Sequence, residues 1–321
     1  MITYIIRRLL YGIPVLVATS FIVYVFVTSA SDPLGQIRMQ PKITPQQVAR
    51  IAHENYLDRP IVVRYGLWAR DAVEHKFGNT LLSHEPIWPD LKRVMGHTIQ
   101  LLLSVIILSV LIAVAIGVYS AVRQYSVFDY GMTTFSFLGF ATPVFWLALI
   151  LQVIFTDIYL NWHVRIFYTA QLSQPNAHNF LLDRVQHLAL PVLTLTALSV
   201  AQYSRYMRAS MLEVINSDYV RTARAKGLSE GRVIMRHAFR NALIPLVTVV
   251  AIDFGALFAG AIVTETVFTL DGMGYYFVQA LFKGDPNPVM AWLIVTATMV
   301  IVFNLIADLV YGILDPRIRY D

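Results

Sequence analysis

The chain has 321 residues, of which 57% are hydrophobic and only 14% are charged, with a mean hydropathy of +0.58 and a formal net charge of +5. Soluble domains carry roughly a quarter charged residues, so this composition argues against a soluble globular protein and indicates one that lies mostly in lipid. Cysteine is absent, which excludes a disulfide framework, a thiolate metal site and a cysteine nucleophile.

Six apolar segments are long enough to cross a membrane, because a spanning helix needs about 20 residues. They are predicted at 9–30, 99–120, 131–155, 188–206, 242–264 and 289–313. The third and fourth contain Pro143 and Pro191, which spanning helices tolerate when neighbouring groups satisfy the freed backbone. The sequence therefore predicts an all-α membrane protein with six transmembrane helices, five of which lie with their connections in residues 99–313.

The first apolar segment follows Arg7 and Arg8 and has small residues after it, as a cleaved signal peptide would. A signal peptide has an apolar region of only about 7–15 residues, and segment 9–30 is longer. We therefore expect residues 1–30 to be a retained transmembrane helix.

Residues 31–98 are the only part of the sequence with room for structure outside the membrane. Thr44-Pro45-Gln46-Gln47 predicts an N-cap, a proline in the first turn and a capping box, with a helix to about residue 56. A second helix is expected from residue 60 to residue 77, with one apolar side formed by Val62, Tyr65, Leu67, Trp68 and Val73. Such short helices cannot bury a core of their own, so we expect them to lie on the outer membrane surface against the spans or a partner.

The positive charges are distributed unevenly between the connections. With the N-terminus inside, segment 205–240 is cytoplasmic and holds eight Lys or Arg against three acids, whereas the short outer loops hold only Arg165, Arg184 and Lys283. An excess of Lys and Arg marks cytoplasmic loops, so both termini, including the tail 314–321, are predicted in the cytoplasm. Nucleic-acid binding is not expected, because no basic patch is accompanied by base-stacking aromatic residues.

A polar, basic segment, residues 217–245, separates the fourth and fifth apolar segments. Ser217 or Asp218 can cap a short helix, and Gly227 can end it because glycine adopts the left-handed conformation without penalty. Ser229 can cap a second helix. Its basic side chains suit either anionic lipid headgroups or a docking protein, and the residues alone leave both readings open.

This hairpin resembles the cytoplasmic coupling loop of the membrane subunits of ABC importers, specifically those of the dipeptide and oligopeptide branch. The resemblance extends in order and spacing over nearly the whole chain, through IIRRLLYGIPVL, LDRPIVVRYGLW, ATPVFWLALIL, RYMRASMLEV, DYVRTARAKGLS, RHAFRNALIP and NLIADLVYGILDPRIR. TETVF and the DPRIR ending are more similar to the first, B-type, of the two permease subunits in this branch. Arg221-Thr222-Ala223 stands where the general importer loop has Glu-Ala-Ala, a version that the peptide branch commonly shows.

The resemblance implies the type I permease fold and a permease that forms half of the path for di- and oligopeptides across a bacterial cytoplasmic membrane. It also implies a second permease, two ATP-binding subunits that hold ATP and Mg, and an extracytoplasmic solute-binding protein. It implies neither a cofactor nor a catalytic site on this chain. The solutes of the family include peptides, glutathione, nickel complexes and oligosaccharides, so the resemblance does not select one. The ATPase-coupling positions that it implies are Tyr219, Arg221, Thr222, Ala223, Arg224, Ala225, Lys226, Gly227, Leu228 and Ser229.

Motifs that would power transport or catalysis within the chain do not occur in the sequence. It has no G-x-x-x-x-G-K-S/T phosphate loop, no H-E-x-x-H zinc motif and no G-x-S-x-G elbow. Energy for uphill transport would therefore come from a partner or an ion gradient. A secondary transporter would use intramembrane acids such as Asp253 or Asp308 and often an inverted repeat; no repeat is visible, and the hairpin favours the ABC permease.

Two acidic residues of the fifth apolar segment are candidates for the transport path or its gate. Asp253 lies near the middle of the segment, where an acid costs about 2.5–3.5 kcal/mol on insertion scales. It either lines the path and attracts a cationic group or makes a buried hydrogen bond to another helix. Glu265, at the outer end, either contributes to an outer gate or is solvated.

Overall fold

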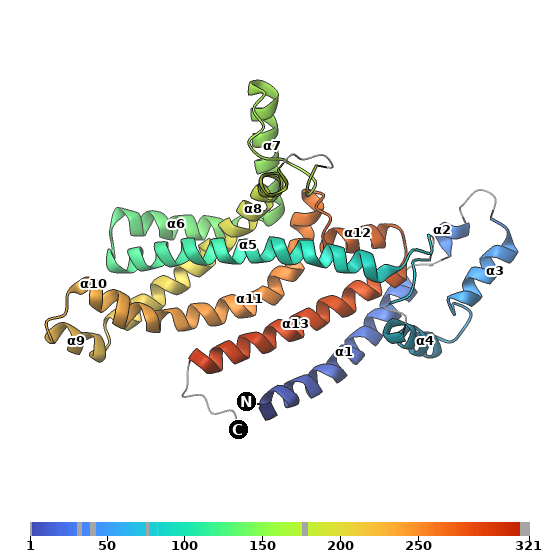
Figure 1. Cartoon of the computed structure of the whole chain (residues 1–321), viewed down its shortest axis with the longest axis horizontal. Coiled ribbons are helices and arrows are strands. Elements are labelled where there is room, and N and C mark those ends of the chain that lie inside the picture. The colour runs from blue at the N-terminus through green and yellow to red at the C-terminus, as the bar shows by residue number, and fades with distance from the viewer. Residues whose placement is uncertain are drawn as a thin grey trace. The chain divides into compact units, whose positions relative to one another are not determined.

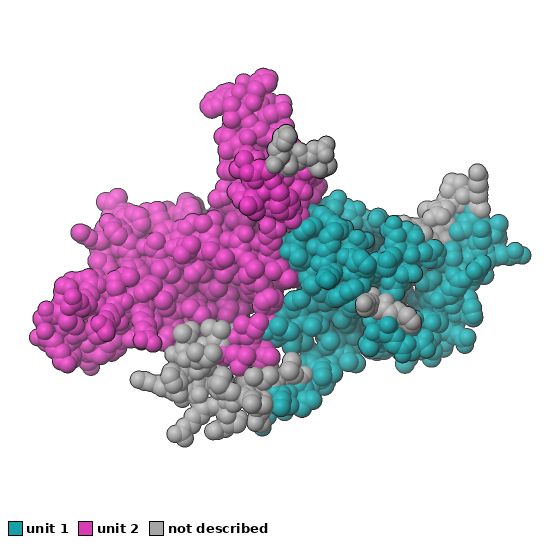
Figure 2. All heavy atoms as spheres, viewed as in Figure 1, with its two compact units in different colours: residues 1–98, 271–302 teal, residues 99–270, 303–321 magenta. Residues whose placement is uncertain are grey.

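The computed structural model describes residues 2–30, 34–38, 43–74, 77–81, 83–174 and 179–314, and these are almost entirely helical. Six of the described helices are long and apolar enough to cross a membrane, in agreement with the all-α prediction. The chain forms two compact units, residues 1–98 with 271–302 and residues 99–270 with 303–321 (Figure 2). The predicted cytoplasmic tail, 314–321, lies outside the described residues except for its first.

The first unit contains the N-terminal helix and the short helices that follow it (Figure 1). Its helices are α1 (Ile2–Ala30), α2 (Gly35–Arg38), α3 (Pro45–Glu54), α4 (Ile61–Glu74), the start of α5 (Ile87–Val122), α12 (Met273–Phe282) and most of α13 (Pro286–Leu314). Of these, α12 was not predicted, because it is too short to be a spanning segment.

The capping box predicted before α3 is confirmed. The Thr44 side chain accepts a hydrogen bond from the Gln47 N–H, and the Gln47 side chain accepts one from the Thr44 N–H at 2.8 Å. The helix ends two residues earlier than predicted, and Tyr56 then takes a φ of 56°.

Helix α4 packs against α1 through aromatic side chains in its middle turn. The rings of Tyr65 and Trp68 lie 5.6 and 5.8 Å from the ring of Tyr24, measured between centroids. Val62 and Val73 of the predicted apolar side are 64% and 84% exposed, so they contribute little to this packing against α1. The contact covers about one turn, and the apolar residues near both ends of α4 lie beyond it.

Asp285 fixes the start of α13 in the first unit. Its carboxylate is 5% exposed and accepts hydrogen bonds from the N–H groups of Leu81, at 2.7 Å, and Asn287, at 3.1 Å. Burial raises the pKa of the Asp285 carboxyl, although both hydrogen bonds favour its charged form.

The second unit is built around α8, the helix with the most extensive burial. Its helices are the remainder of α5, α6 (Val127–Ala141), α7 (Val144–Trp162), α8 (Phe180–Ile215), α9 (Asp218–Ala225), α10 (Glu230–Arg232), the π-helical turn η1 (Val233–Ala238) and α11 (Phe239–Val267). A Cβ atom on Gly117 of α5 would lie 2.6 Å from the Met207 Cβ of α8. Glycine is therefore required for this close approach.

The third predicted span, 131–155, is not one helix. Helix α6 ends at Ala141, Thr142 is extended with a ψ of 122°, and α7 begins after Pro143 in a different direction (Figure 1). Proline disfavours the helical conformation of the residue before it, so the helix breaks at Thr142. Of the two pieces, only α7 has the length of a membrane span. The other five predicted spans all lie within single helices, α1, α5, α8, α11 and α13.

Candidate functional site

The polar hairpin begins with α9, which lies between the predicted cap at Ser217 and the predicted end at Gly227. Ser217 occupies the N-cap position, but its hydroxyl donates a hydrogen bond to the Val214 carbonyl at 2.6 Å instead of capping the helix. The helix ends at Ala225, and Gly227 follows with a φ of +78°. The predicted left-handed glycine is confirmed.

The second arm of the hairpin is not a separate helix. Ser229 precedes α10, which continues through the π-helical turn η1 into α11 without interruption. Val233 and Ala238 of the turn are fully buried, whereas the basic side chains are exposed at Arg232, Arg236 and Arg240. The sequence offers no helix breaker in this stretch, and so the fifth span extends into the hairpin.

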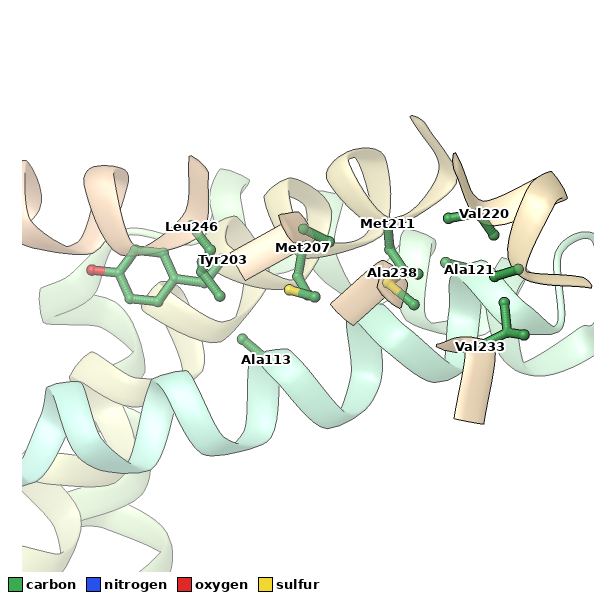
Figure 3. Packing of buried hydrophobic residues seen from close by; sticks show 11 residues of the cluster. Ala113, Ala121, Tyr203, Met207, Met211, Val220, Val233, Ala238 and Leu246 are labelled. Atoms are coloured by element: carbon green, nitrogen blue, oxygen red, sulfur yellow. The ribbon is translucent and has the colours of Figure 1, made fainter. Parts of the chain in front are cut away.

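The apolar side of α9 rests on the second unit. Val220 and Ala223 are 0% and 6% exposed and belong to one buried cluster, which we call the inner cluster (Figure 3). Its other members come from α5, α8, η1 and α11: Ala113, Ala121, Tyr203, Met207, Met211, Val233, Ala238, Ala242 and Leu246. Through the inner cluster, α9 therefore packs with residues of three long helices, α5, α8 and α11.

The opposite side of α9 is polar and accessible. Of the ten predicted coupling residues, seven are exposed: Tyr219, Arg221, Thr222, Ala225, Lys226, Gly227 and Ser229. Arg224 and Leu228 are half-buried; Arg224 makes an ion pair with Glu230 at 2.7 Å, which ties α9 to the second arm. Ala223 faces the inner cluster, so it anchors the helix and is not presented at the surface.

An ion pair that the sequence analysis missed joins α6 to α8. The Arg208 guanidinium donates to both carboxylate oxygens of Asp129, at 2.6 and 2.8 Å, and the Tyr125 N–H donates a third hydrogen bond at 3.0 Å. The Arg208 hydrogen bonds hold the pKa of the buried Asp129 carboxyl below its usual value. Ser126 three residues before Asp129 is a capping signal, but nothing in the sequence identifies Arg208 as the partner.

The structure gives Asp253 a partner on another helix. The Gln202 side-chain amide of α8 donates a hydrogen bond to the Asp253 carboxylate at 3.0 Å. Asp253 remains half-buried. The contact is a helix-to-helix hydrogen bond that leaves part of the Asp253 side chain accessible.

Glu265 is 1% exposed, which excludes the second of its two predicted alternatives, a solvated side chain. It lies twelve residues after Asp253 on α11, which corresponds to about 18 Å along the helix axis. The two acids therefore do not form one site. Within the described ranges, no three His, Cys, Asp or Glu side chains form a group that could hold a metal ion.

Comparison with known proteins gives one family and several relatives. Residues 113–320 match the family model described as binding-protein-dependent transport system inner membrane component. The chain is 38% identical over its whole length to the oligopeptide transport system permease protein AppB of Bacillus subtilis (strain 168), all of which is covered. It is 37% identical to OppB, an oligopeptide transport system permease protein of Mycobacterium tuberculosis (strain ATCC 25618 / H37Rv), and 32% identical to the dipeptide transport system permease protein DppB of Escherichia coli (strain K12). These two alignments cover 99% and 100% of this chain and 99% of each relative.

A solved structure shares the fold. It is titled as a crystal structure of an amino acid ABC transporter with histidines, has a TM-score of 0.53 and 12% sequence identity, and is matched over 70% of this chain and 93% of its own. At this identity the likeness concerns the fold alone, which is that of a type I importer membrane subunit. The residues that match the family model include the whole of the hairpin, α8, α11 and the last ten residues of α5.

Proposed function

Because the chain belongs to the family of binding-protein-dependent transport system inner membrane components, we propose that it is the permease subunit of an ATP-driven importer of short peptides. Its full-length relatives are named as permease proteins of oligopeptide and dipeptide transport systems. The chain is thus a multi-pass membrane transport subunit, and the solute that we assign to it is a di- or oligopeptide.

The hairpin is the observation that supports the ATP-driven mechanism best. Its α9 presents a polar surface and rests with its apolar side on the inner cluster. We assign the polar surface to one of two ATP-binding subunits, which would bind ATP and Mg. When these subunits close, α9 is displaced, and the inner cluster transmits the displacement to α5, α8 and α11. The path then opens alternately to the two sides of the membrane.

A second permease completes the path in this proposal. Only 6% of the apolar spanning part of α7 is buried within the chain. Large apolar side chains on α6 and α7 are exposed, among them Phe137, Phe140 and Trp146. Exposed apolar surface of this extent needs lipid or a second apolar subunit to cover it. A solute-binding protein delivers peptide from outside a bacterial cytoplasmic membrane, and both termini lie in the cytoplasm.

Uptake by the reconstituted complex tests this function. Vesicles that contain this chain, its partner permease and the ATP-binding subunits are given the solute-binding protein and a labelled dipeptide. We expect accumulation that requires ATP and stops when this chain is omitted. Accumulation that follows an ion gradient without ATP would show a secondary transporter instead.

A further inference from the structure

The first unit contains a cavity that the coupling mechanism does not use. Its empty volume is about 650 Å³, part of which is open solvent. It is enclosed by α1, the end of α3, α4, residues 77–81 and the start of α13. The positive-inside topology places this region outside the membrane. The lining residues that matter chemically are Tyr24, Glu54, Arg64, Trp68, Asp71 and Phe77.

Arg64 contributes a positive charge to the lining of this cavity and interacts there with the Tyr24 side chain. Its guanidinium lies over the ring of Tyr24, 6.0 Å from the centroid. The Nε atom is buried without a hydrogen-bond partner, and none of the ion pairs between described residues includes Arg64. A buried donor without a partner costs free energy. A carboxylate is the group that satisfies a guanidinium best, because it accepts two parallel hydrogen bonds.

Two carboxylates line the same cavity. Glu54 and Asp71 each form an ion pair at the rim, with Arg50 at 2.7 Å and with Arg70 at 3.0 Å. A carboxylate has about four acceptor positions, so the ion pair with Arg50 leaves Glu54 capacity for a further donor. These acids would repel a phosphate dianion. A ligand with one positive and one negative end is favoured over a purely anionic one.

The walls of the cavity are aromatic. The rings of Tyr24 and Trp68 lie 5.8 Å apart, and Tyr56 and Phe77 also contribute to the lining. Binding sites for small molecules combine such apolar walls with a few placed polar groups. Aromatic walls suit the apolar side chains that lie between the charged ends of a short peptide.

We propose that this cavity binds a short peptide as a zwitterion. Arg64 pairs with the C-terminal carboxylate, Glu54 and Asp71 receive the N-terminal ammonium group, and the aromatic walls contact the peptide side chains. The choice of a peptide rests on the proposed function, while the site itself belongs to the first unit, shares no residue with α9 and does not include Asp253. The cavity provides an outer binding step on the permease chain itself.

The test compares peptides on the full-length chain in lipid nanodiscs, without the solute-binding protein. The probes are labelled Ala-Phe, its C-terminal amide and its N-acetyl form. The amide lacks the carboxylate that pairs with Arg64, so we expect its Kd to be about tenfold higher than that of free Ala-Phe. The N-acetyl form lacks the ammonium group, and its Kd should rise by a similar factor. In Arg64→Gln, free Ala-Phe binds about tenfold more weakly, and amidation has no further effect. Arg59→Gln, an exposed arginine of the same outer segment, serves as the matched control and binds like wild type.

Equal affinity of the wild-type chain for free and amidated peptide would overturn the proposal, and this comparison needs no variant to fold. Unchanged binding in Arg64→Gln would also overturn it. If Arg64→Gln weakens only the capture of the solute-binding protein, the carboxylate that Arg64 binds belongs to that protein, and the peptide site is refuted. ATP-driven uptake by the assembled complex is measured in parallel. If uptake still depends on ATP while the binding results refute the peptide site, the proposed function as a peptide importer subunit is not contradicted.

Discussion

At the scale of single residues, Gly227 determines how the two arms of the hairpin connect. Its φ is +78°, and a Cβ atom added there would meet nothing within 4 Å. A side chain at this position therefore has room, and its cost comes from the backbone conformation alone. A residue with a branched Cβ is the least compatible with a positive φ.

We expect Gly227→Val to destabilise the connection by about 1–2 kcal/mol, the cost of the left-handed conformation for a residue with a side chain. Membrane insertion should be normal, while the ATP-binding subunits are lost on purification and uptake is lost with them. Gly231→Val is the matched control, because Gly231 is also open to solvent but lies in α10 without a positive φ. Co-purification and normal uptake in Gly227→Val would show that this turn is not needed for coupling.

Two substitutions of Asp253 separate the effect of its charge from the effect of its hydrogen bond. Asp253→Asn keeps an acceptor for the Gln202 amide and removes the charge, whereas Asp253→Leu removes both and leaves that amide unpaired at a cost of about 1–3 kcal/mol. We expect the Asn variant to assemble and hydrolyse ATP normally but to import peptides with cationic side chains several-fold more slowly.

Neutral peptides of the same length are the control in this uptake assay, and their import should not change in the Asn variant. Wild-type import of cationic peptides in Asp253→Asn, combined with disassembly of Asp253→Leu, would refute the path role and assign Asp253 to helix packing.

At the scale of elements, the Asp129–Arg208 ion pair holds α6 against α8. The side chain of Asp129 is 3% exposed and that of Arg208 is 28% exposed. We expect Asp129→Asn to lower the thermal unfolding midpoint, since hydrogen bonds to charged groups contribute about 1.5–3 kcal/mol.

The same pair makes stability depend on acidity. Because the folded-state pKa of Asp129 is lowered, its contribution is present above the ordinary carboxyl pKa of 3.8 and is lost as the pH falls through the lowered value. The melting temperatures of wild type and Asp129→Asn should therefore begin to approach each other below about pH 4 and meet only below the lowered pKa. A constant gap between the two proteins down to pH 2 would contradict this assignment.

Much of the helical order follows from hydropathy, and the exceptions have local causes. Five of six predicted spans are single helices because apolar length is read directly from the sequence. The break at Thr142 cannot be predicted from hydropathy, because the residues on both sides of it are apolar. Pro143 does not predict it either, because proline also occurs inside intact helices, such as α8 at Pro191. Helix α12 and the π-helical turn η1 depend on tertiary contacts, which the hydrophobic periodicity of the sequence does not predict.

The position of α9 was predictable, but its orientation was not. Ser217 and Gly227 delimit the helix in the sequence, whereas the burial of Val220 and Ala223 requires the inner cluster that α5, α8 and α11 build. The partners Gln202 and Arg208 were missed for the same reason. Each lies more than fifty residues from the acid that it contacts, and one sequence contains no signal for such pairs.

At the scale of the whole molecule, the distribution of basic residues predicts the topology. Segment 205–240 holds eight Lys or Arg, and such loops stay in the cytoplasm. The chain contains no cysteine, so single introduced thiols are labelled without background. We expect an impermeant maleimide to label Pro60→Cys in intact cells and to label Glu230→Cys only after permeabilisation. Labelling of residue 230 in intact cells would contradict the six-span topology.

The central claim is that the exposed side of α9 contacts an ATP-binding subunit. A photo-crosslinking amino acid in place of Arg221, whose side chain is 71% exposed, tests it in the assembled, active complex in membranes. The same amino acid in place of Val73, 84% exposed on α4, is the control on the predicted outer side. We expect a crosslink from position 221 to an ATP-binding subunit and none from position 73. Crosslinks from position 221 to lipid alone, in a complex that still imports peptide, would contradict the claim and assign the hairpin to the membrane surface.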